Sequence, residues 1–318
     1  SFVPDLRIRV SVPGTTPPPA NPSRLRLLGY AEALAAACIW GSSGIFAVHL
    51  FRVGIPPASL ALLRPVVGSV LLLAFLGLTR RLALRIPTKG IWVLLLGGGS
   101  AIAVFQIAYQ LSTDAVGVPS TVAMLYLAPA IVAAASGPLL GEWPDRRKLV
   151  LLAVTLAGVW LSVLGANEVP ATFGTTGLAW GILAGTSYAI YTLFGRFAAP
   201  RYGTLPTVVY STVGSCIILS VVVPITTGPV TWPSSGQAWA LLLAFGALTI
   251  AAAHFLFFDA LTRLDASRVS ITTAVEPVVA SVLATVLLSQ GLSPLGWAGI
   301  GLVGIGVAGV GLTASEDR

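Results

Sequence analysis

The chain has 318 residues, of which 56% are hydrophobic and only 9% are charged. Soluble domains carry about 25% charged residues, so this composition excludes an ordinary soluble globule. The net charge of +7 would suit nucleic-acid binding, but the basic residues lie in loops between apolar segments, which favours a membrane protein without a nucleic-acid partner.

Apolar segments recur along the whole chain. A bilayer core about 30 Å thick needs about 20 apolar residues per helix, so each segment predicts one transmembrane helix. The predicted ranges are 29–50, 57–78, 91–112, 116–140, 149–166, 177–198, 205–226, 237–261, 267–289 and 294–313. We therefore predict an all-α integral membrane protein with ten transmembrane helices.

The basic residues predict the orientation of these helices. All but two of the 18 Lys and Arg residues fall in alternate loops on one side, whereas Arg52 lies on the other side and Arg64 lies inside a helix. Because positively charged loops stay in the cytoplasm, both termini are predicted to be cytoplasmic. Residues 1–28 would then form a Pro-rich cytoplasmic tail, and residues 314–318 would form a second, shorter one.

The sequence repeats itself at a displacement of 148 residues without a gap. Each copy holds five predicted helices, an odd number, so the second copy would enter the membrane from the opposite side. We predict two inverted five-helix repeats, residues 29–166 and 177–313, joined by an external linker at 167–176. This architecture is typical of alternating-access transporters. Identical residues fall together at Gly29/Gly177, Phe46/Phe194, Gly98/Gly246, Pro129/Pro277 and Gly158/Gly306.

No cofactor site is expected. Two overlapping G-x-G-x-x-G patterns occur within the last helix, from Gly299 to Gly309, but a dinucleotide site needs a preceding strand and a following acidic residue. These glycines are therefore interpreted as helix-packing positions. The chain has no phosphate-binding loop, and no metal cluster is expected around His254, because His49 is the only other histidine and lies at the outer end of the first predicted helix.

Several short motifs resemble those of the EamA-type drug/metabolite transporters. They are Trp40–Phe46 (WGSSGIF) in the first helix, Arg64 in the second, and Pro129 followed by the pair Gly141-Glu142 in the fourth. The resemblance covers residues 29–313 and implies a ten-helix layout like that of the YddG-like amino-acid exporters. The second copy keeps the proline but has Ser289-Gln290 in place of the Gly-Glu pair, so a symmetric role for two glutamates is not implied.

Pro129 and Pro277 lie near the middles of the fourth and ninth predicted helices. A proline removes one backbone hydrogen bond and displaces the carbonyl four residues earlier, here at Leu125 and Thr273. Such a break usually faces protein or a water-filled cavity. We expect both helices to bend at a substrate chamber and to act as hinges, the alternative being a passive kink.

The candidate substrate-binding residues are polar and aromatic side chains, several at equivalent depths of the two copies, with ordinary core packing as the alternative for each aromatic one. The first, third and fourth helices and their partners would line the chamber, while the fifth and tenth would brace it from outside. The candidates are Trp40, Ser42, Ser43, Gln106, Tyr109, Gln110, Tyr126, Tyr188, Tyr191, His254, Phe257, Thr273 and Glu276.

Three ionisable residues in the helices have alternative roles. A charge at the bilayer centre costs at least about 2.5–3.5 kcal/mol, so Glu276 either binds an amino group, exchanges a proton or bonds to a neighbouring helix. His254 is either a neutral hydrogen-bonding group or part of a proton-coupling path. Arg64 either snorkels to the surface, pairs with Asp114 or meets a substrate carboxylate.

An intramembrane serine protease is a competing interpretation, because Gly41–Gly44 reads G-x-S-G and His254 could serve as the base. Such a dyad needs hydrogen-bond contact of about 3 Å, whereas Ser43 is predicted toward the outer half and His254 toward the inner half. A twofold five-helix repeat is also not that fold. An enzyme is therefore not expected.

The resemblance implies a transporter in the inner membrane that exports amino acids or similar small metabolites. A multidrug exporter of hydrophobic cations would also use Glu276 and the aromatic residues, and a facilitator without ion coupling is a further alternative. Proton coupling stays open. Because one chain holds both inverted halves, a functional monomer in the lipid bilayer is expected.

Overall fold

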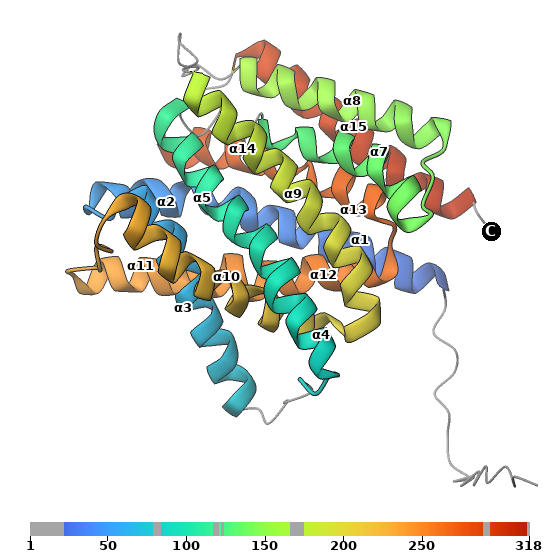
Figure 1. The fold of residues 1–318 in the computed structure, drawn as a ribbon. Helices are drawn as coiled ribbons and strands as arrows, with labels where there is room; N and C mark the ends of the chain where they lie inside the picture. The colour runs from blue at the N-terminus through green and yellow to red at the C-terminus, as the bar shows by residue number, and fades with distance from the viewer. Residues whose placement is uncertain are drawn as a thin grey trace, which may run out of the picture.

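The computed structural model describes residues 22–78, 84–116, 121, 124–165, 175–288 and 293–316, and every regular element within them is a helix (Figure 1). We refer to residues 22–165 as the first half and to residues 175–316 as the second half. Residues 1–21 of the predicted tail, most of the predicted linker 167–176, and the pair Ser289-Gln290 lie outside the described residues.

Seven of the described helical stretches are long and apolar enough to cross a membrane, and two further apolar stretches are shorter. The chain is therefore an all-helical, multi-pass membrane protein. The long stretches are Ser23–Arg52, Pro57–Leu78, Thr88–Thr113, Thr175–Tyr202, Thr204–Thr227, Gly236–Arg263 and Ala266–Leu287, and the shorter ones are Leu127–Leu140 and Pro294–Gly309.

In the first half, the helix begins earlier than the sequence predicts, at Pro22 instead of residue 29, so the end of the predicted tail is helical. The first predicted helix is also divided in two, and the third contains a π-helical turn. The elements are α1 (Pro22–Gly41), α2 (Ser43–Arg52), α3 (Pro57–Leu78), α4 (Thr88–Trp92), the π-helix η1 (Val93–Gly98), α5 (Gly99–Val116), α7 (Leu127–Leu140) and α8 (Arg146–Leu164).

The second half follows the same order of elements, and only some of its breaks correspond to those of the first half. Its first long helix is continuous, whereas its last-but-one is divided. The elements are α9 (Thr175–Tyr202), α10 (Thr204–Thr227), α11 (Gly236–Gly246), the π-helix η2 (Ala247–Ala252), α12 (Ala253–Arg263), α13 (Ala266–Thr273), α14 (Glu276–Leu288) and α15 (Pro294–Glu316).

Both mid-helix prolines follow an interruption of the helix. Pro129 lies in the first turn of α7, which begins after a turn at Tyr126, and Pro277 is the second residue of α14, which follows a turn at Ala274 and Val275. A proline cannot donate to the carbonyl four residues back, so the chain leaves the α-helical pattern just before it. These two breaks occupy equivalent positions of the 148-residue repeat.

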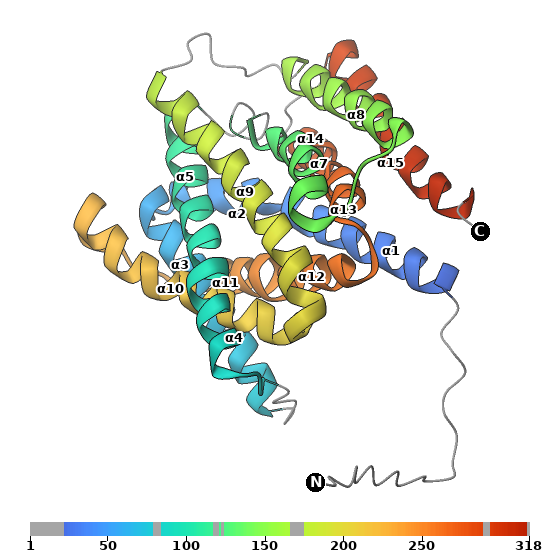
Figure 2. The same cartoon turned by 45° about the vertical axis from the view of Figure 1, so that its right-hand side comes forward.

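Helices α8 and α15 pack along each other at one edge of the molecule, in both views of the fold (Figures 1 and 2). Glycine permits this close approach. A Cβ atom added to Gly158 would lie 2.7 Å from the backbone nitrogen of Val303 and 2.8 Å from the carbonyl oxygen of Gly299. Gly306 and Gly309 of α15 face Thr155 and Leu151 of α8 in the same way, so part of the glycine-rich pattern of α15 serves helix packing, as small residues do in membrane proteins.

Ion pairs gather near one end of the helices, which we call the charged end. Three of the pairs connect the first half with the second, so at this end the two halves are bonded to each other. The pairs are Arg196–Glu142 (2.5 Å), Lys148–Asp265 (2.7 Å), Arg263–Glu32 (2.8 Å), Arg268–Asp265 (3.4 Å) and Arg263–Asp259.

Burial alone would raise the pKa of the Asp265 carboxyl group, which lies between two membrane-spanning stretches at the charged end. The hydrogen bond from Lys148 and the positive charges of Arg268 and Lys148 outweigh that effect and hold the pKa below its ordinary value. Asp265 is therefore ionised in the folded protein at neutral pH.

The pair Gly141-Glu142 has a local structural explanation at the charged end. Gly141 ends α7 with a φ of +74°, a left-handed conformation that favours glycine. The turn delivers Glu142 to the second half, where one carboxylate oxygen accepts a bond from Arg196 Nε and the other accepts a bond from the N–H of Ala266 (3.0 Å). Glu142 thus caps the N-terminus of α13 from the opposite half of the chain.

Candidate functional site

A cavity lies between the two halves. It is narrow, because the space open to the centre of a water molecule is about 30 Å³, room for about two waters. Helices α8 and α15 contribute nothing to its lining. The lining residues are Trp40, Ser43, Arg64, Ile102, Phe105, Tyr109, Leu125, Tyr188, Tyr191, His254 and Glu276.

Seven of the thirteen candidate binding residues line this cavity. They are Trp40, Ser43, Tyr109, Tyr188, Tyr191, His254 and Glu276. The other candidates lie behind or beside it. Ser42 bonds to the carbonyl of Ile39 (2.6 Å), Thr273 bonds to that of Ser270 (3.1 Å), and Phe257 is fully buried behind the tyrosines. The sequence interpretation did not include Arg64, Ile102, Phe105 or Leu125 among the lining residues.

Three predicted polar residues are buried outside the cavity lining and leave hydrogen-bonding atoms unsatisfied. Gln106 and Gln110 are each 1% exposed, one turn apart on α5. The amide oxygen of Gln106, both polar atoms of Gln110 and the hydroxyl of Tyr126 have no hydrogen-bond partner among the described residues. Buried polar groups are normally paired, so these atoms could form hydrogen bonds if the packing of the helices changed.

The motif that begins at Trp40 builds one wall of the cavity. Trp40 and Ser43 line it, and between them the helix breaks at Ser42. Gly41 lets this break approach α14 closely, because a Cβ atom there would lie 2.8 Å from the carbonyl oxygen of Glu276. The small residue between Trp40 and Ser43 therefore brings the first helix against the acidic residue of the cavity.

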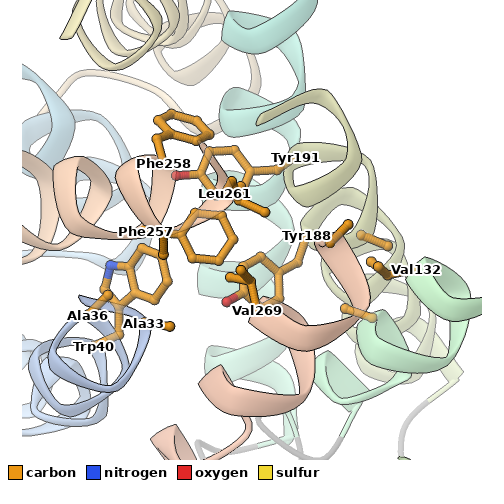
Figure 3. Packing of buried hydrophobic residues seen from close by; sticks show 14 of the residues in the cluster. Ala33, Ala36, Trp40, Val132, Tyr188, Tyr191, Phe257, Phe258, Leu261 and Val269 are labelled. Carbon is orange, nitrogen blue, oxygen red and sulfur yellow. The ribbon is translucent and has the colours of Figure 1, made fainter. Parts of the chain in front are cut away.

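Aromatic rings form an adjoining wall, which includes Trp40. Tyr191 stacks on Phe257 with ring centroids 5.3 Å apart, and Tyr188 stacks on the same ring at 6.2 Å. Trp40 contacts both Phe257, with ring centroids 5.1 Å apart, and Tyr188, which it meets edge to face at 6.1 Å. Figure 3 shows the indole of Trp40 and the rings of Tyr188 and Tyr191 grouped around Phe257. Phe257 thus contacts the three rings, Trp40, Tyr188 and Tyr191, that line the cavity.

The π-helix η2 supplies a carbonyl that holds two cavity residues. The carbonyl oxygen of Thr249 accepts a bond from Trp40 Nε1 (2.9 Å) and lies 2.8 Å from His254 Nδ1. A carbonyl only accepts, so His254 Nδ1 carries a hydrogen, and in the neutral ring Nε2 is left as an acceptor.

Arg64 and Glu276 bring opposite charges to the same cavity. Arg64 is 4% exposed, with its guanidinium carbon 4.7 Å from the centre of the Phe245 ring. It therefore does not snorkel to the surface, and the side chain of Asp114, its expected partner, lies outside the described residues. Among the described residues, no hydrogen bond or ion pair within 4.0 Å joins Arg64 to Glu276.

The structure does not form the hydrogen-bonded dyad that the protease interpretation requires. Ser43 and His254, which are predicted at different depths, line the same cavity. No hydrogen bond joins them among the described residues, and His254 Nδ1 bonds to Thr249 instead. The part of the chain that the structure describes also holds no group of three His, Cys, Asp or Glu residues that could bind a metal ion.

The fold and the cavity define a class, a polytopic helical membrane protein with a polar and aromatic chamber between its halves. The chain belongs to the EamA-like transporter family, whose model matches twice, at residues 27–164 and 175–312. The second match begins and ends 148 residues after the first. The two family matches therefore have the same displacement, 148 residues, as the internal repeat of the sequence.

Relatives of the chain are transporters by name. The threonine/homoserine exporter RhtA of Escherichia coli (strain K12) is 28% identical, over 82% of this chain and 83% of its own length. YwfM of Bacillus subtilis (strain 168), an uncharacterized transporter, is 25% identical over 84% and 88%. YicL of Salmonella typhimurium (strain LT2), an uncharacterized inner membrane transporter, is 23% identical over 85% and 91%.

A solved crystal structure has the same fold. It superposes with a TM-score of 0.75 and covers 93% of this chain and 99% of its own, at 20% sequence identity. At this identity the likeness concerns the arrangement of helices alone.

Proposed function

We propose that this protein is a secondary transporter that exports amino acids or similar small metabolites across the inner membrane by alternating access. The observation that carries the proposal is the cavity between the two halves, in which Arg64, Glu276 and His254 accompany aromatic rings. Ligand sites of this kind are mostly apolar with a few placed polar groups. The name of RhtA supports an amino-acid substrate.

In this proposal the chain forms ten transmembrane helices in two inverted repeats, residues 29–166 and 177–313. Support comes from Trp40 and Tyr188, which occupy equivalent positions of the two family matches and contact each other edge to face. Residues related by a twofold axis touch each other only near that axis. The cavity would then lie on the axis, near the bilayer midplane, where such transporters bind substrate.

The charged end supports a model of alternating access. Its ion pairs join the first half to the second, so the cavity is closed toward that end while they persist. Because most basic residues lie in loops of this side, the positive-inside rule makes it cytoplasmic, with both termini there. The helix breaks before Pro129 and Pro277 would serve as hinges when the halves rock.

Flux of labelled amino acids into liposomes containing the purified protein tests the proposal. We expect protein-dependent counterflow of L-threonine that competing small amino acids reduce. Absence of flux for every amino acid, together with flux of a lipophilic cation, would replace this proposal with a multidrug exporter, which Glu276 and the aromatic wall would also suit.

Proton coupling is tested in the same liposomes with an imposed pH gradient. If Glu276 exchanges a proton during transport, the wild-type flux should depend on the gradient and the flux of Glu276→Gln should not. A facilitator without coupling would show equal flux with and without the gradient. Unchanged pH dependence in Glu276→Gln would assign Glu276 a structural role.

A further inference from the structure

We propose that Arg64 and Glu276 together recognise the two charges of a zwitterionic α-amino acid, the carboxylate at Arg64 and the ammonium group at Glu276. This inference rests on the proposed function and names the substrate class of its site. It starts from two opposite charges that face one cavity without bonding to each other.

The guanidinium of Arg64 is available to an anion. Arg64 is 4% exposed, and its Nε has no hydrogen-bond partner among the described residues. The guanidinium carbon lies 4.7 Å from the centre of the Phe245 ring, and no hydrogen bond or ion pair to another described residue uses the edge of the guanidinium plane. Arginine binds carboxylates with two parallel N–H bonds, so a substrate carboxylate is the group that fits this side chain.

Glu276 is the complementary group for a cation. It is the first residue of α14, immediately after the helix break, and the N-terminus of a helix stabilises a negative charge. His254 lines the same cavity and, in its neutral form, leaves Nε2 as an acceptor because Nδ1 bonds to Thr249. A carboxylate and an imidazole nitrogen are both acceptors for an ammonium group.

The two side chains line the same narrow cavity, and among the described residues they are not paired with each other. In a chamber shielded from water each charge is costly without a partner. A direct ion pair would remove that cost and close the site, whereas a zwitterion between them satisfies both groups at once. The unpaired arrangement therefore favours a ligand that carries both charges over a simple cation or anion.

The site also has a fixed polarity. The repeat places Thr212 opposite Arg64 and Ala128 opposite Glu276, so neither charge has a counterpart in the other half. Thr212 is fully buried and bonds to the carbonyl of Val208 within its own helix. The pseudo-twofold axis therefore offers no second, reversed orientation, and an amino acid would bind in one direction.

Competition in threonine counterflow tests the inference. The probes are L-threonine, L-threoninamide, which lacks the carboxylate, and N-acetyl-L-threonine, which lacks the ammonium group. In the wild type, L-threonine should compete at least about tenfold better than either analogue, the range of one hydrogen bond to a charged group. If L-threoninamide or N-acetyl-L-threonine competes as well as L-threonine, the inference is wrong while the proposed function stands.

Two variants assign the charges. Arg64→Gln should abolish the preference over L-threoninamide and keep the preference over N-acetyl-L-threonine, and Glu276→Gln should do the opposite. Arg52→Gln, at an exposed arginine, is the matched control and should behave as the wild type. Variants that keep both preferences, or that change the wrong one, would overturn the assignment.

Binding can be separated from turnover and from folding. The shift in Tm of detergent-solubilised protein on addition of each probe reads binding without transport, and a monodisperse elution profile shows that the variant is folded. If Arg64→Gln does not fold, Arg64→Lys keeps the charge and should keep the preference over L-threoninamide. No flux of any amino acid in the wild type would instead overturn the proposed function.

Discussion

Glu142 is expected to hold the two halves together at the charged end, and Glu142→Gln is the substitution that tests this. The carboxylate accepts a bond from Arg196 Nε at 2.5 Å and one from the N–H of Ala266 at 3.0 Å. Because the side chains of Glu142 and Arg196 are only 19% and 25% exposed, solvent screens this pair less than a fully exposed one.

The magnitude follows from the bonds that the substitution removes. A hydrogen bond to a charged group contributes about 1.5–3 kcal/mol. Glutamine keeps one accepting oxygen, so the variant loses the charge and one of the two bonds, and the cost should be about 1.5–3 kcal/mol. A change of 1.4 kcal/mol is about tenfold in an equilibrium constant, so local opening of this end should become about 10- to 100-fold more frequent.

Hydrogen exchange of the first turn of α13, around Ala266, measures that opening directly. Exchange there should be about 10- to 100-fold faster in Glu142→Gln. Asp145→Asn is the matched control, since Asp145 is exposed and bonds only to the N–H of Lys148 in its own half. Equal exchange rates in the two variants, or no change in Glu142→Gln, would refute the reasoning.

Two further predictions concern stability. Because the pKa of Asp265 is lowered in the folded protein, its bond with Lys148 stabilises at neutral pH and is lost as the pH falls through the folded-state value. Asp265→Asn should therefore lower Tm at pH 7 by the equivalent of about 1–2 kcal/mol and flatten the acid limb of Tm against pH; an unchanged acid limb would contradict this. Gly158→Leu should destabilise the α8–α15 pair by about 1–3 kcal/mol because its Cβ would meet the nitrogen of Val303 at 2.7 Å. Gly301→Leu, where nothing lies within 4 Å of the added Cβ, should leave the thermal unfolding of detergent-solubilised protein unchanged, and equal losses in both variants would contradict the packing argument.

The positions of the helices follow from the sequence because apolar length is a direct requirement of the bilayer. Each predicted range overlaps a helix in the part of the chain that the structure describes. The breaks before Pro129 and Pro277 fall where the missing proline N–H weakens the helix, although Pro65 lies inside the unbroken helix α3. The break at Ser42 carries no comparable signal, since serine is compatible with a helix interior.

The faces of the helices are harder to predict, and this limits the site. A buried helix is apolar all round, so its pattern does not say which side faces the cavity. The sequence interpretation therefore places Gln106 and Gln110 in the chamber, whereas the residues of this helix that line it are Ile102, Phe105 and Tyr109. The π-helices η1 and η2 add to the difficulty, because a wider turn rotates every residue that follows.

The role of Arg64 is also not determined by the sequence. A lone arginine in an apolar helix is consistent with snorkelling, with an ion pair or with ligand binding, and the sequence does not distinguish these. Only the packing of Phe245 against the guanidinium and the common cavity with Glu276 separate them. The tertiary neighbours that decide the question come from helices far away in the chain.

The ion pairs at the charged end would make the apparent affinity for substrate differ between the two sides of the membrane. An apparent dissociation constant equals the intrinsic one divided by the fraction of molecules open to that side. If the pairs hold most molecules closed toward the charged end, substrate there meets few receptive molecules, and its half-saturation concentration is higher on that side. Net flux still follows the gradients, so the asymmetry would tune sensitivity to concentration on each side and leave the direction of transport unchanged.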